Sequence, residues 1–279
     1  MSANGLSLQY VFVIPSTADA IAASVAVAAQ LGLPSDSPVV VAQGYSVRVR
    51  LDPAPVLTRV VTTGRVLRGE PRPWMEREIA VSRYLVAAGA PVAPPWHEAG
   101  PHQRHGLDVS LWHWLEPVPG PVPADVYGPL LKGLHDLLDH YDADLPVLVG
   151  PLTDIATALR TSKDCVLHEA AARLVPLALT WPQRPLHGDA HTGNVLNTSA
   201  GPRWMDFEDV CAGPVEWDLA SRSLDANYVD AYPGEIDRDR LEDCRDLRCL
   251  QILAGILTDD IQDASLYDDV TARLCRRQG

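Results

Sequence analysis

The segment LHGDAHTGNVLNTSAGPRWMDFED, residues 186–209, concentrates side chains that can do chemistry. Histidines, an asparagine amide and carboxylates stand among its apolar residues: His187, Asp189, His191, Asn194, Asp206, Glu208 and Asp209. Oxygen donors of this kind suit a hard cation or a proton transfer, whereas histidine with carboxylate suits a transition metal. The chemistry that applies depends on how the surrounding chain positions these groups.

Two short strands flank a turn inside this segment. The residues from Thr198 to Pro202 have turn chemistry, and strand-like residues stand on both sides of them. Asn194 and Asp206 are symmetric about Ala200, so an antiparallel pair should bring them face to face, about 5 Å apart. An amide oxygen beside a carboxylate suits Mg²⁺, which prefers oxygen ligands and keeps positions for water and phosphate. We therefore expect Asn194 and Asp206 to be metal ligands.

Asp189 completes a pattern that phosphoryl transfer requires. Such a reaction needs one carboxylate that orients a hydroxyl and accepts its proton, and a metal ion that neutralises the phosphates. The spacing D-x-x-x-x-N from Asp189 to Asn194 matches the kinase catalytic loop, and Asp206-Phe207 stands where the kinase Asp-Phe pair would. The segment thus predicts a kinase that uses Mg²⁺ and ATP, or GTP in its place, with Asp189 as the catalytic base.

Length and charge limit what the rest of the chain does. The chain has 279 residues, of which 47% are hydrophobic, enough for one large domain or two lobes. A net charge of −13 disfavours binding to nucleic acid or to an anionic membrane. The acidic excess is concentrated from Asp206 to the C-terminal end. A solvated acidic surface is the simpler explanation, and the alternative is a half that attracts a cationic small-molecule acceptor.

The five cysteines predict a reducing compartment. They are scattered, odd in number and without a C-x-x-C pair, which is typical of free thiols rather than of disulfides or a zinc site. The apolar segment Ile21–Ala29 follows no Lys or Arg and is too short to span a bilayer. We interpret it as a buried helix that ends near Gly32, and we expect a cytoplasmic protein.

The chain changes character near its middle. Residues 38–67 are rich in Val and Thr with breaks between, which predicts three or four antiparallel strands. Residues 73–92 predict a helix that Gly89 ends, and a strand follows from Leu107. After the break at Pro117–Pro123, helical spacing dominates, in residues 125–141, 164–181 and 239–261. The hairpin around Ala200 is the only convincing strand pair of the second half.

These patterns predict an α+β protein with two lobes. The N-lobe, residues 1–116, would contain a leading helix, an antiparallel sheet, one further helix and a hinge strand. The C-lobe, residues 117–279, would be helical and would carry the catalytic loop and the metal-binding hairpin.

The motifs HGDAHTGNVL and WMDFED resemble the aminoglycoside phosphotransferase and choline kinase-like family, the phosphotransferase enzyme family. The resemblance extends over roughly residues 35–225 and implies a protein-kinase-like fold. It implies that Asp189 is catalytic, that Asn194 and Asp206 bind the metal, and that Glu78 pairs with a strand cation. It further implies that backbone groups of His113, Trp114 and Leu115 hold adenine, that Asp218 braces the catalytic loop, and that His187 and His191 shape it.

The chain departs from the family pattern at the phosphates. The first lysine is Lys132, so the expected strand lysine is absent and Arg59 stands in its place. Arginine is always charged and offers a planar fork of donors, so it can hold phosphate with a different geometry. We expect Arg59 to pair with Glu78 and to reach the phosphates. The glycine-rich loop is reduced to Gly44 with Ser46, which we expect at the nucleotide.

Other readings of the same residues stay open. His187, Asp189 and His191 could hold the metal of a hydrolase, with His97, His102 or His105 adding ligands. A non-catalytic nucleotide-binding protein could share the fold. Trp217 is the one tryptophan that the pattern leaves as a substrate contact. The acceptor of a kinase reaction could be an aminoglycoside, an amino sugar, another sugar or an amino alcohol.

Overall fold

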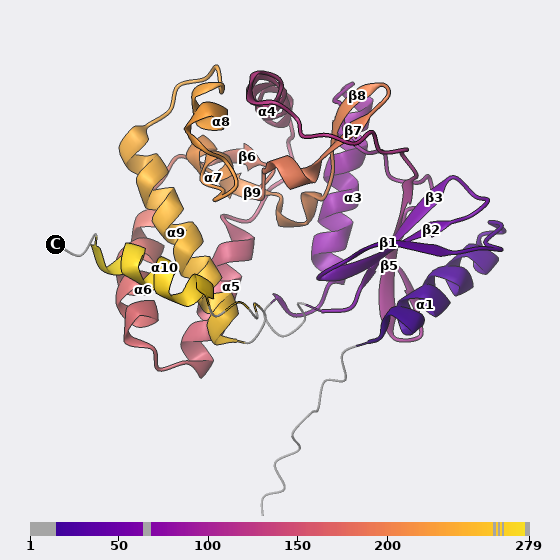
Figure 1. The fold of residues 1–279 in the computed structure, drawn as a ribbon, viewed down its shortest axis with the longest axis horizontal. Coiled ribbons are helices and arrows are strands. Elements are labelled where there is room, and N and C mark those ends of the chain that lie inside the picture. Colours follow the sequence, from indigo (N-terminus) through magenta and orange to yellow (C-terminus); the bar gives the residue numbers. More distant parts are fainter. Residues whose placement is uncertain (1–14, 64–67, 259–260, 262, 264, 277–279) are drawn as a thin grey trace, which may run out of the picture.

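A computed structural model of the protein describes residues 15–63, 68–258, 261, 263 and 265–276. An antiparallel sheet with two helices forms one lobe, and a larger set of helices forms the other (Figure 1). The predicted two-lobed α+β fold is thus confirmed. The predicted boundary between residues 116 and 117 stays a prediction; it falls between the end of the last sheet strand at His113 and the next helix at Ala124.

The sheet of the N-lobe has five strands in the spatial order β1-β2-β3-β5-β4. They are β1 (Val39–Gln43), β2 (Ser46–Leu51), β3 (Val56–Val61), β4 (His102–Arg104) and β5 (Leu107–His113). β2 alternates: Val47, Val49 and Leu51 are buried, and Arg48 and Arg50 between them are partly exposed. Side chains of a strand point alternately to its two faces, so the valines belong to the core and the arginines to the opposite face.

Two helices accompany the sheet. α1 (Thr17–Gln30) begins with a capping box between Ser16 and Asp19, and its buried face joins the valines of β2 in one core. α3 (Arg72–Ala87) is followed by Gly89 in a left-handed conformation at φ +79°, as expected for the glycine that ends a helix. The expected strands between residues 38 and 67 are β1, β2 and β3, and residues 64–67 lie outside the described part.

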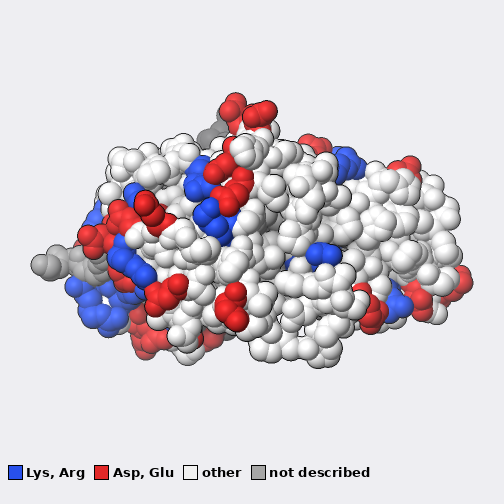
Figure 2. All heavy atoms as spheres, turned by 90° about the horizontal axis from the view of Figure 1, so that it is seen from above, with Lys and Arg blue, Asp and Glu red and all other residues white. Residues whose placement is uncertain are grey.

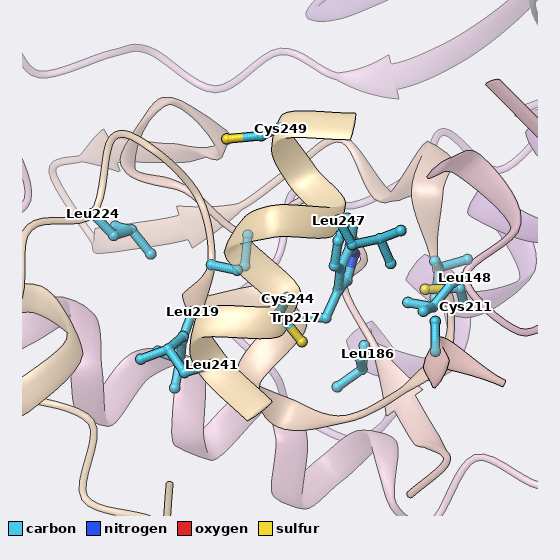
Figure 3. Close-up of a cluster of buried hydrophobic side chains, with 14 of the residues drawn as sticks. Leu148, Leu186, Cys211, Trp217, Leu219, Leu224, Leu241, Cys244, Leu247 and Cys249 are labelled. Atoms are coloured by element: carbon cyan, nitrogen blue, oxygen red, sulfur yellow. The ribbon is translucent and has the colours of Figure 1, made fainter. Parts of the chain in front are cut away.

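Most of the C-lobe is helical. Its helices are α4 (Ala124–Leu138), α5 (Val149–Thr161), α6 (Cys165–Ala178), α7 (Val215–Leu219), α8 (Ala226–Asp230), α9 (Arg238–Leu257) and α10 (Ser265–Arg276). α9 runs through the lobe, and Figure 3 shows Leu241, Cys244 and Leu247 on it beside Trp217. The sequence predicted α4, α6 and α9, and the family resemblance implied a helix in GPVEWDLAS, where α7 lies, whereas α5, α8 and α10 were not predicted.

The C-lobe also contains two short strand pairs. β7 (Val195–Thr198) and β8 (Gly201–Trp204) form the predicted hairpin. β6 (Arg184–Leu186) pairs with β9 (Cys211–Gly213), so the expectation of a single strand pair in this half was wrong. Two turns of 3-10 helix, η1 (Thr192–Asn194) and η2 (Phe207–Asp209), lie at the open end of the hairpin.

The cysteines and the surface charges can be compared with what the composition predicted. All five cysteines are free, as predicted. No helix within the described residues has the length and apolarity needed to cross a membrane. On the face shown in Figure 2, acidic side chains lie interspersed with basic ones towards the C-terminal end of the helical lobe, and the middle of this face carries few charged side chains. On this face the acidic excess therefore forms no patch of a single sign.

Candidate active site

The loop that carries Asp189 is held in place by the buried carboxylate of Asp218. Asp218, on α7, accepts hydrogen bonds from the backbone N–H of His187 at 2.9 Å and of Gly188 at 2.8 Å. His135 Nε2 lies 2.9 Å from the same carboxylate and donates to it, because an ionised carboxylate can only accept. Burial acts to raise the pKa of Asp218, but the hydrogen bonds from His135 and Gly188 and the charges of His135 and His187 together outweigh it, and the pKa is lowered. Asp218 therefore braces the loop, as predicted.

The two loop histidines are engaged in shaping the chain. His187 is fully buried, its Nε2 donates to Met205 O at 3.0 Å, and its Nδ1 accepts from Asp189 N at 3.4 Å. Burial lowers the pKa of His187, which favours the neutral ring that this pattern requires. His191 Nδ1 accepts from Gly193 N at 3.0 Å, and its Nε2 lies 3.5 Å from Asp189 Oδ2.

Asn194 and Asp189 are brought into direct contact. The Asn194 amide nitrogen donates to Asp189 O at 2.9 Å and lies 3.4 Å from Asp189 Oδ2. The amide nitrogen of Asn194 is thereby fixed towards Asp189. The side chain of Asp189 remains 35% exposed, so a second reactant can approach it.

A cation that the sequence did not indicate also contacts Asp189. Arg248, on α9, places Nη1 3.3 Å from Asp189 Oδ1 and donates from Nη2 to Gly188 O at 3.2 Å. Its guanidinium lies 3.8 Å from the centre of the Trp217 ring. Burial acts to raise the pKa of Asp189, but His191 and Arg248 hold it below the ordinary value. Asp189 is therefore ionised and oriented.

Trp217 is a core residue. Its side chain is fully buried, and its ring nitrogen donates to Gly188 O at 2.7 Å. The interpretation of Trp217 as a substrate contact was wrong, since the ring supports Arg248 and the loop from within the lobe.

The hairpin register differs from the prediction by one residue. Thr198 pairs with Gly201 across a two-residue turn, so the centre of symmetry falls between Ser199 and Ala200. Asn194 consequently faces Met205, whose N–H donates to Asn194 O at 3.0 Å. Asp206 follows in a left-handed conformation, with φ 67° and ψ 58°, which aspartate tolerates better than most residues. This backbone turn, rather than cross-strand pairing, directs Asp206 towards the N-lobe arginines.

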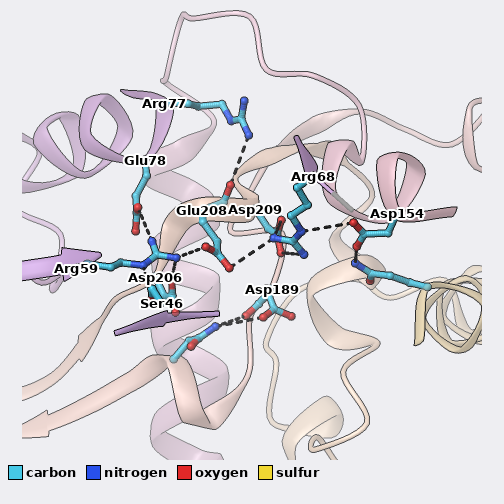
Figure 4. Close-up of polar contacts among 12 residues, drawn as sticks. Ser46, Arg59, Arg68, Arg77, Glu78, Asp154, Asp189, Asp206, Glu208 and Asp209 are labelled. Atoms are coloured by element: carbon cyan, nitrogen blue, oxygen red, sulfur yellow. Dashed lines mark hydrogen bonds and ion pairs between the residues drawn. The ribbon is translucent and has the colours of Figure 1, made fainter. Parts of the chain in front are cut away.

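Arg59 is at the centre of a cluster of carboxylates between the lobes (Figure 4). Its Nη1 binds Glu78 Oε2 at 2.7 Å, which confirms the predicted pair. Its Nε donates to Ser46 Oγ at 3.1 Å, and its Nη2 pairs with Glu208 and with Asp206, the latter at 3.3 Å. Burial acts to lower the pKa of Arg59, but these carboxylates raise it above the ordinary value. Ser46 thus contacts the site through Arg59.

Glu208 and Asp209, which the sequence singled out without a role, bind one further arginine, Arg68. Arg68 Nη1 lies 2.9 Å from Asp209 Oδ1 and 3.5 Å from Glu208 Oε1. Asp209 is buried, and burial raises its pKa to about 7 although Arg68 opposes the shift. Arg68 Nε also lies 3.5 Å from Asp154 on α5, so Arg68 of the N-lobe contacts both η2 and α5 of the helical lobe (Figure 4).

The donor set around Asp206 fits a hard cation. Asp206 Oδ1 is buried and takes part in no hydrogen bond with the described residues, although Arg59 lies nearby. Within the described residues, the four carboxylates of Glu78, Asp206, Glu208 and Asp209 form ion pairs with three guanidiniums, those of Arg48, Arg59 and Arg68. An under-coordinated carboxylate oxygen, an amide oxygen on Asn194 and a surplus of negative charge are what Mg²⁺ binding requires.

A cavity of about 210 Å³ lies between the sheet and the hairpin. His113, Trp114 and Leu115 line it on the side where the N-lobe ends, and Arg48, Arg59 and Asp206 line it as well. The N–H groups of His113 and Trp114 already donate to Pro94 O and Pro55 O. Among the described residues, the N–H of Leu115 has no backbone partner of this kind, so it is the donor of the three best able to meet a ligand.

The transition-metal reading receives no support. Within the described residues, no group of three or more His, Cys, Asp or Glu side chains is arranged to hold a metal ion. His187 uses both ring nitrogens in the loop. His102, in β4 at the edge of the sheet, binds Glu98 O, and His105 lies in the turn after that strand.

Solved structures of similar fold include kinases of small molecules. Choline kinase from Streptococcus pneumoniae is 11% identical, with a TM-score of 0.65 over 91% of this chain and 97% of that chain. An amicoumacin kinase in complex with AMP-PNP and Ca²⁺ is 14% identical, with a TM-score of 0.61 over 90% of this chain and 91% of that chain. A thermostable mutant of the aminoglycoside phosphotransferase APH(4)-Ia, in a ternary complex with ADP and hygromycin B, is 13% identical, with a TM-score of 0.62 over 91% of this chain and 97% of that chain.

The sequence itself points to the same group. A comparison with the curated proteins finds no match. The sequence model of the phosphotransferase enzyme family matches residues 39–253, which include the sheet, the catalytic loop, the hairpin and most of α9. The chain therefore belongs to the phosphotransferase enzyme family.

Proposed function

We propose that the protein is a small-molecule kinase that transfers the γ-phosphoryl group of ATP, or of GTP, to a hydroxyl of a small polar acceptor. One observation carries the proposal: Asn194 contacts Asp189, Asp206 lies close enough for the charge of Asp189 to act on it, and Asp206 lines a cavity together with the N-lobe arginines and the hinge. Phosphoryl transfer requires a base beside two oxygen ligands for a cation, next to a cleft that accommodates a nucleotide.

Each residue has a defined task in this proposal. The acceptor hydroxyl donates a hydrogen bond to Asp189, which takes its proton as the acceptor oxygen bonds to the γ-phosphorus and the bond to the β-phosphate oxygen breaks. Arg248 and Asn194 hold the carboxylate of Asp189 in place. Asn194 and Asp206 would hold Mg²⁺, which supplies positive charge to the phosphates. Leu115 would offer its N–H to the base.

For the acceptor we propose a broad class of small polar molecules rather than one compound. By their names, the proteins of the structures above act on choline, on amicoumacin or on an aminoglycoside. At 11–14% identity they support the fold, and the acceptor is left among aminoglycosides, amino sugars, other sugars and amino alcohols.

The test is a panel of such acceptors with ATP and, separately, with GTP in the presence of Mg²⁺, scored for release of nucleoside diphosphate. We expect acceptor-dependent release that disappears in Asp189→Asn. The matched control is Asp136→Asn, which removes an exposed carboxylate of α4 that pairs with Lys132. If the purified protein binds neither ATP nor GTP, the proposal is contradicted whatever the acceptor is.

A further inference from the structure

Arg59 is occupied by the protein itself. Its side chain is only 5% exposed, and its donors meet Ser46, Glu78, Asp206 and Glu208. A guanidinium has five N–H groups, so little of its donor capacity remains for a ligand. Releasing any of these buried carboxylates would leave it unpaired in a dry environment, which is strongly unfavourable. Arg59 therefore has the properties of a fixed support.

Arg48 differs from Arg59 in each of these respects. The two residues stand directly opposite each other in the β2–β3 register. Arg48 is 25% exposed and lines the cavity between the lobes. Within the described part of the chain, Asp206 is the one carboxylate that forms an ion pair with it. A guanidinium with one partner and access to the cavity has donors to offer to a ligand.

We propose that Arg48 is the side chain that binds the phosphates of the nucleotide, and that Arg59 is a strut that holds Glu78, Asp206 and Glu208 in place. This inference rests on the proposed function and refines it. The chain lacks a lysine before Lys132, so in this proposal another cation of the N-lobe binds the phosphates. Arginine binds phosphate through two parallel N–H bonds, a geometry that a lysine cannot reproduce. A phosphate that replaces Asp206 as the partner of Arg48 also makes the Asp206 carboxylate available to a cation.

The alternation of β2 explains why this residue is available. Val47 and Val49 are buried against the core shared with α1, so Arg48 must project from the other face, which is the face of the cavity. Arg50 projects from that same face two residues further along. It pairs weakly with Asp52 at 3.6 Å and lies over the Trp114 ring, and it does not line the cavity. The strand thus provides its own matched control.

The test compares ADP with adenosine, two probes that share the base and sugar and differ in the phosphates. Calorimetric titration of each into the wild type, Arg48→Ala and Arg50→Ala gives a ratio of the two affinities for each protein. We expect Arg48→Ala to weaken ADP binding about ten- to a hundredfold and to leave adenosine binding unchanged. Arg50→Ala should keep the wild-type ratio. Arg48→Lys should recover only part of the loss, because the ammonium cannot form the paired bonds.

Two results would overturn the inference alone: a wild-type affinity for ADP in Arg48→Ala, or an equal fall in the affinities for ADP and for adenosine. A wild type that binds neither ADP nor adenosine would instead overturn the proposed function together with it. Arg48→Gln, which keeps most of the side-chain length, serves as a second variant, and thermal unfolding of both variants checks that the fold is intact.

Discussion

Arg248 and Asp189 form an ion pair across the helical lobe, with Nη1 of the arginine 3.3 Å from Oδ1 of the aspartate. The guanidinium is itself held by the Trp217 ring, by Gly188 O and by the side-chain oxygen of Gln251. A buried, stacked cation of this kind fixes both the ionisation and the direction of the carboxylate that the proposed reaction uses as its base.

The first prediction is that Arg248→Ala lowers kcat at least tenfold and leaves nucleotide affinity near the wild-type value, because Asp189 loses its orienting partner while the nucleotide cavity is untouched. Arg248→Lys should restore part of kcat. Arg245→Ala, which removes a partly exposed arginine paired with Glu242 on the same helix, is the control. Steady-state kinetics with calorimetry would separate the two quantities. A wild-type kcat in Arg248→Ala would refute the positioning role.

The second prediction concerns the stability that Asp218 provides. Asp218→Asn should lower the free energy of unfolding at neutral pH by about 1–3 kcal/mol, because the amide cannot accept all the hydrogen bonds that the carboxylate does. The folded pKa of Asp218 is lowered below 3.8, so its contribution is fully present above that pH and is lost as the pH falls through the folded value. The difference between wild type and variant should therefore shrink below about pH 4. Denaturant unfolding of both proteins at neutral pH and below about pH 4 measures the difference in their free energies of unfolding. A difference that grows on acidification would contradict the prediction.

The third prediction is that Arg59→Ala destabilises the protein by about 3–5 kcal/mol, because it leaves the buried Glu78 without its partner. Arg50→Ala, on the neighbouring strand, should change stability by no more than about 0.5 kcal/mol. Thermal and denaturant unfolding of the two variants provide the comparison. If Arg59→Ala is as stable as Arg50→Ala, Arg59 is not the strut that its contacts indicate.

The fourth prediction concerns the cation. Asp206→Asn should raise the Mg²⁺ concentration needed for half-maximal activity at least tenfold, since a carboxylate ligand is replaced by an amide that carries no charge. Calorimetric titration of Mg²⁺ with ADP into the same variant gives a readout that is independent of turnover. Unchanged metal dependence in both measurements would show that Asp206 is not a ligand.

The catalytic loop could be predicted because its information is local. Asp189, Asn194 and Asp206 lie within one short segment, and their order and spacing specify a chemistry. The pair Arg59 and Glu78 was predicted from a resemblance that aligned strand and helix. The hairpin register was missed by one residue because the choice between a two-residue and a longer turn depends on backbone conformation around Gly201, which composition alone does not fix.

Arg248 and Arg48, which contact Asp189 and Asp206 from distant segments of the chain, left no such signal in the sequence. Arg248 lies far along the chain on α9, which buries polar as well as apolar residues, so periodicity did not mark it. Arg48 alternates with buried valines, which predicts a face of the strand but not the cavity that the face meets. Both roles arise from tertiary packing between segments that are distant in sequence.

The central claim is that Asp189 is the base of a small-molecule kinase, and Asp189→Asn tests it most directly. Nucleotide turnover should be measured with the acceptor that the panel identifies, next to calorimetric titration of ADP into the same protein. We predict a loss of kcat of about a hundred- to ten-thousandfold with nucleotide affinity close to that of the wild type. An Asp189→Asn variant that folds, binds nucleotide and retains most of its kcat would contradict the account.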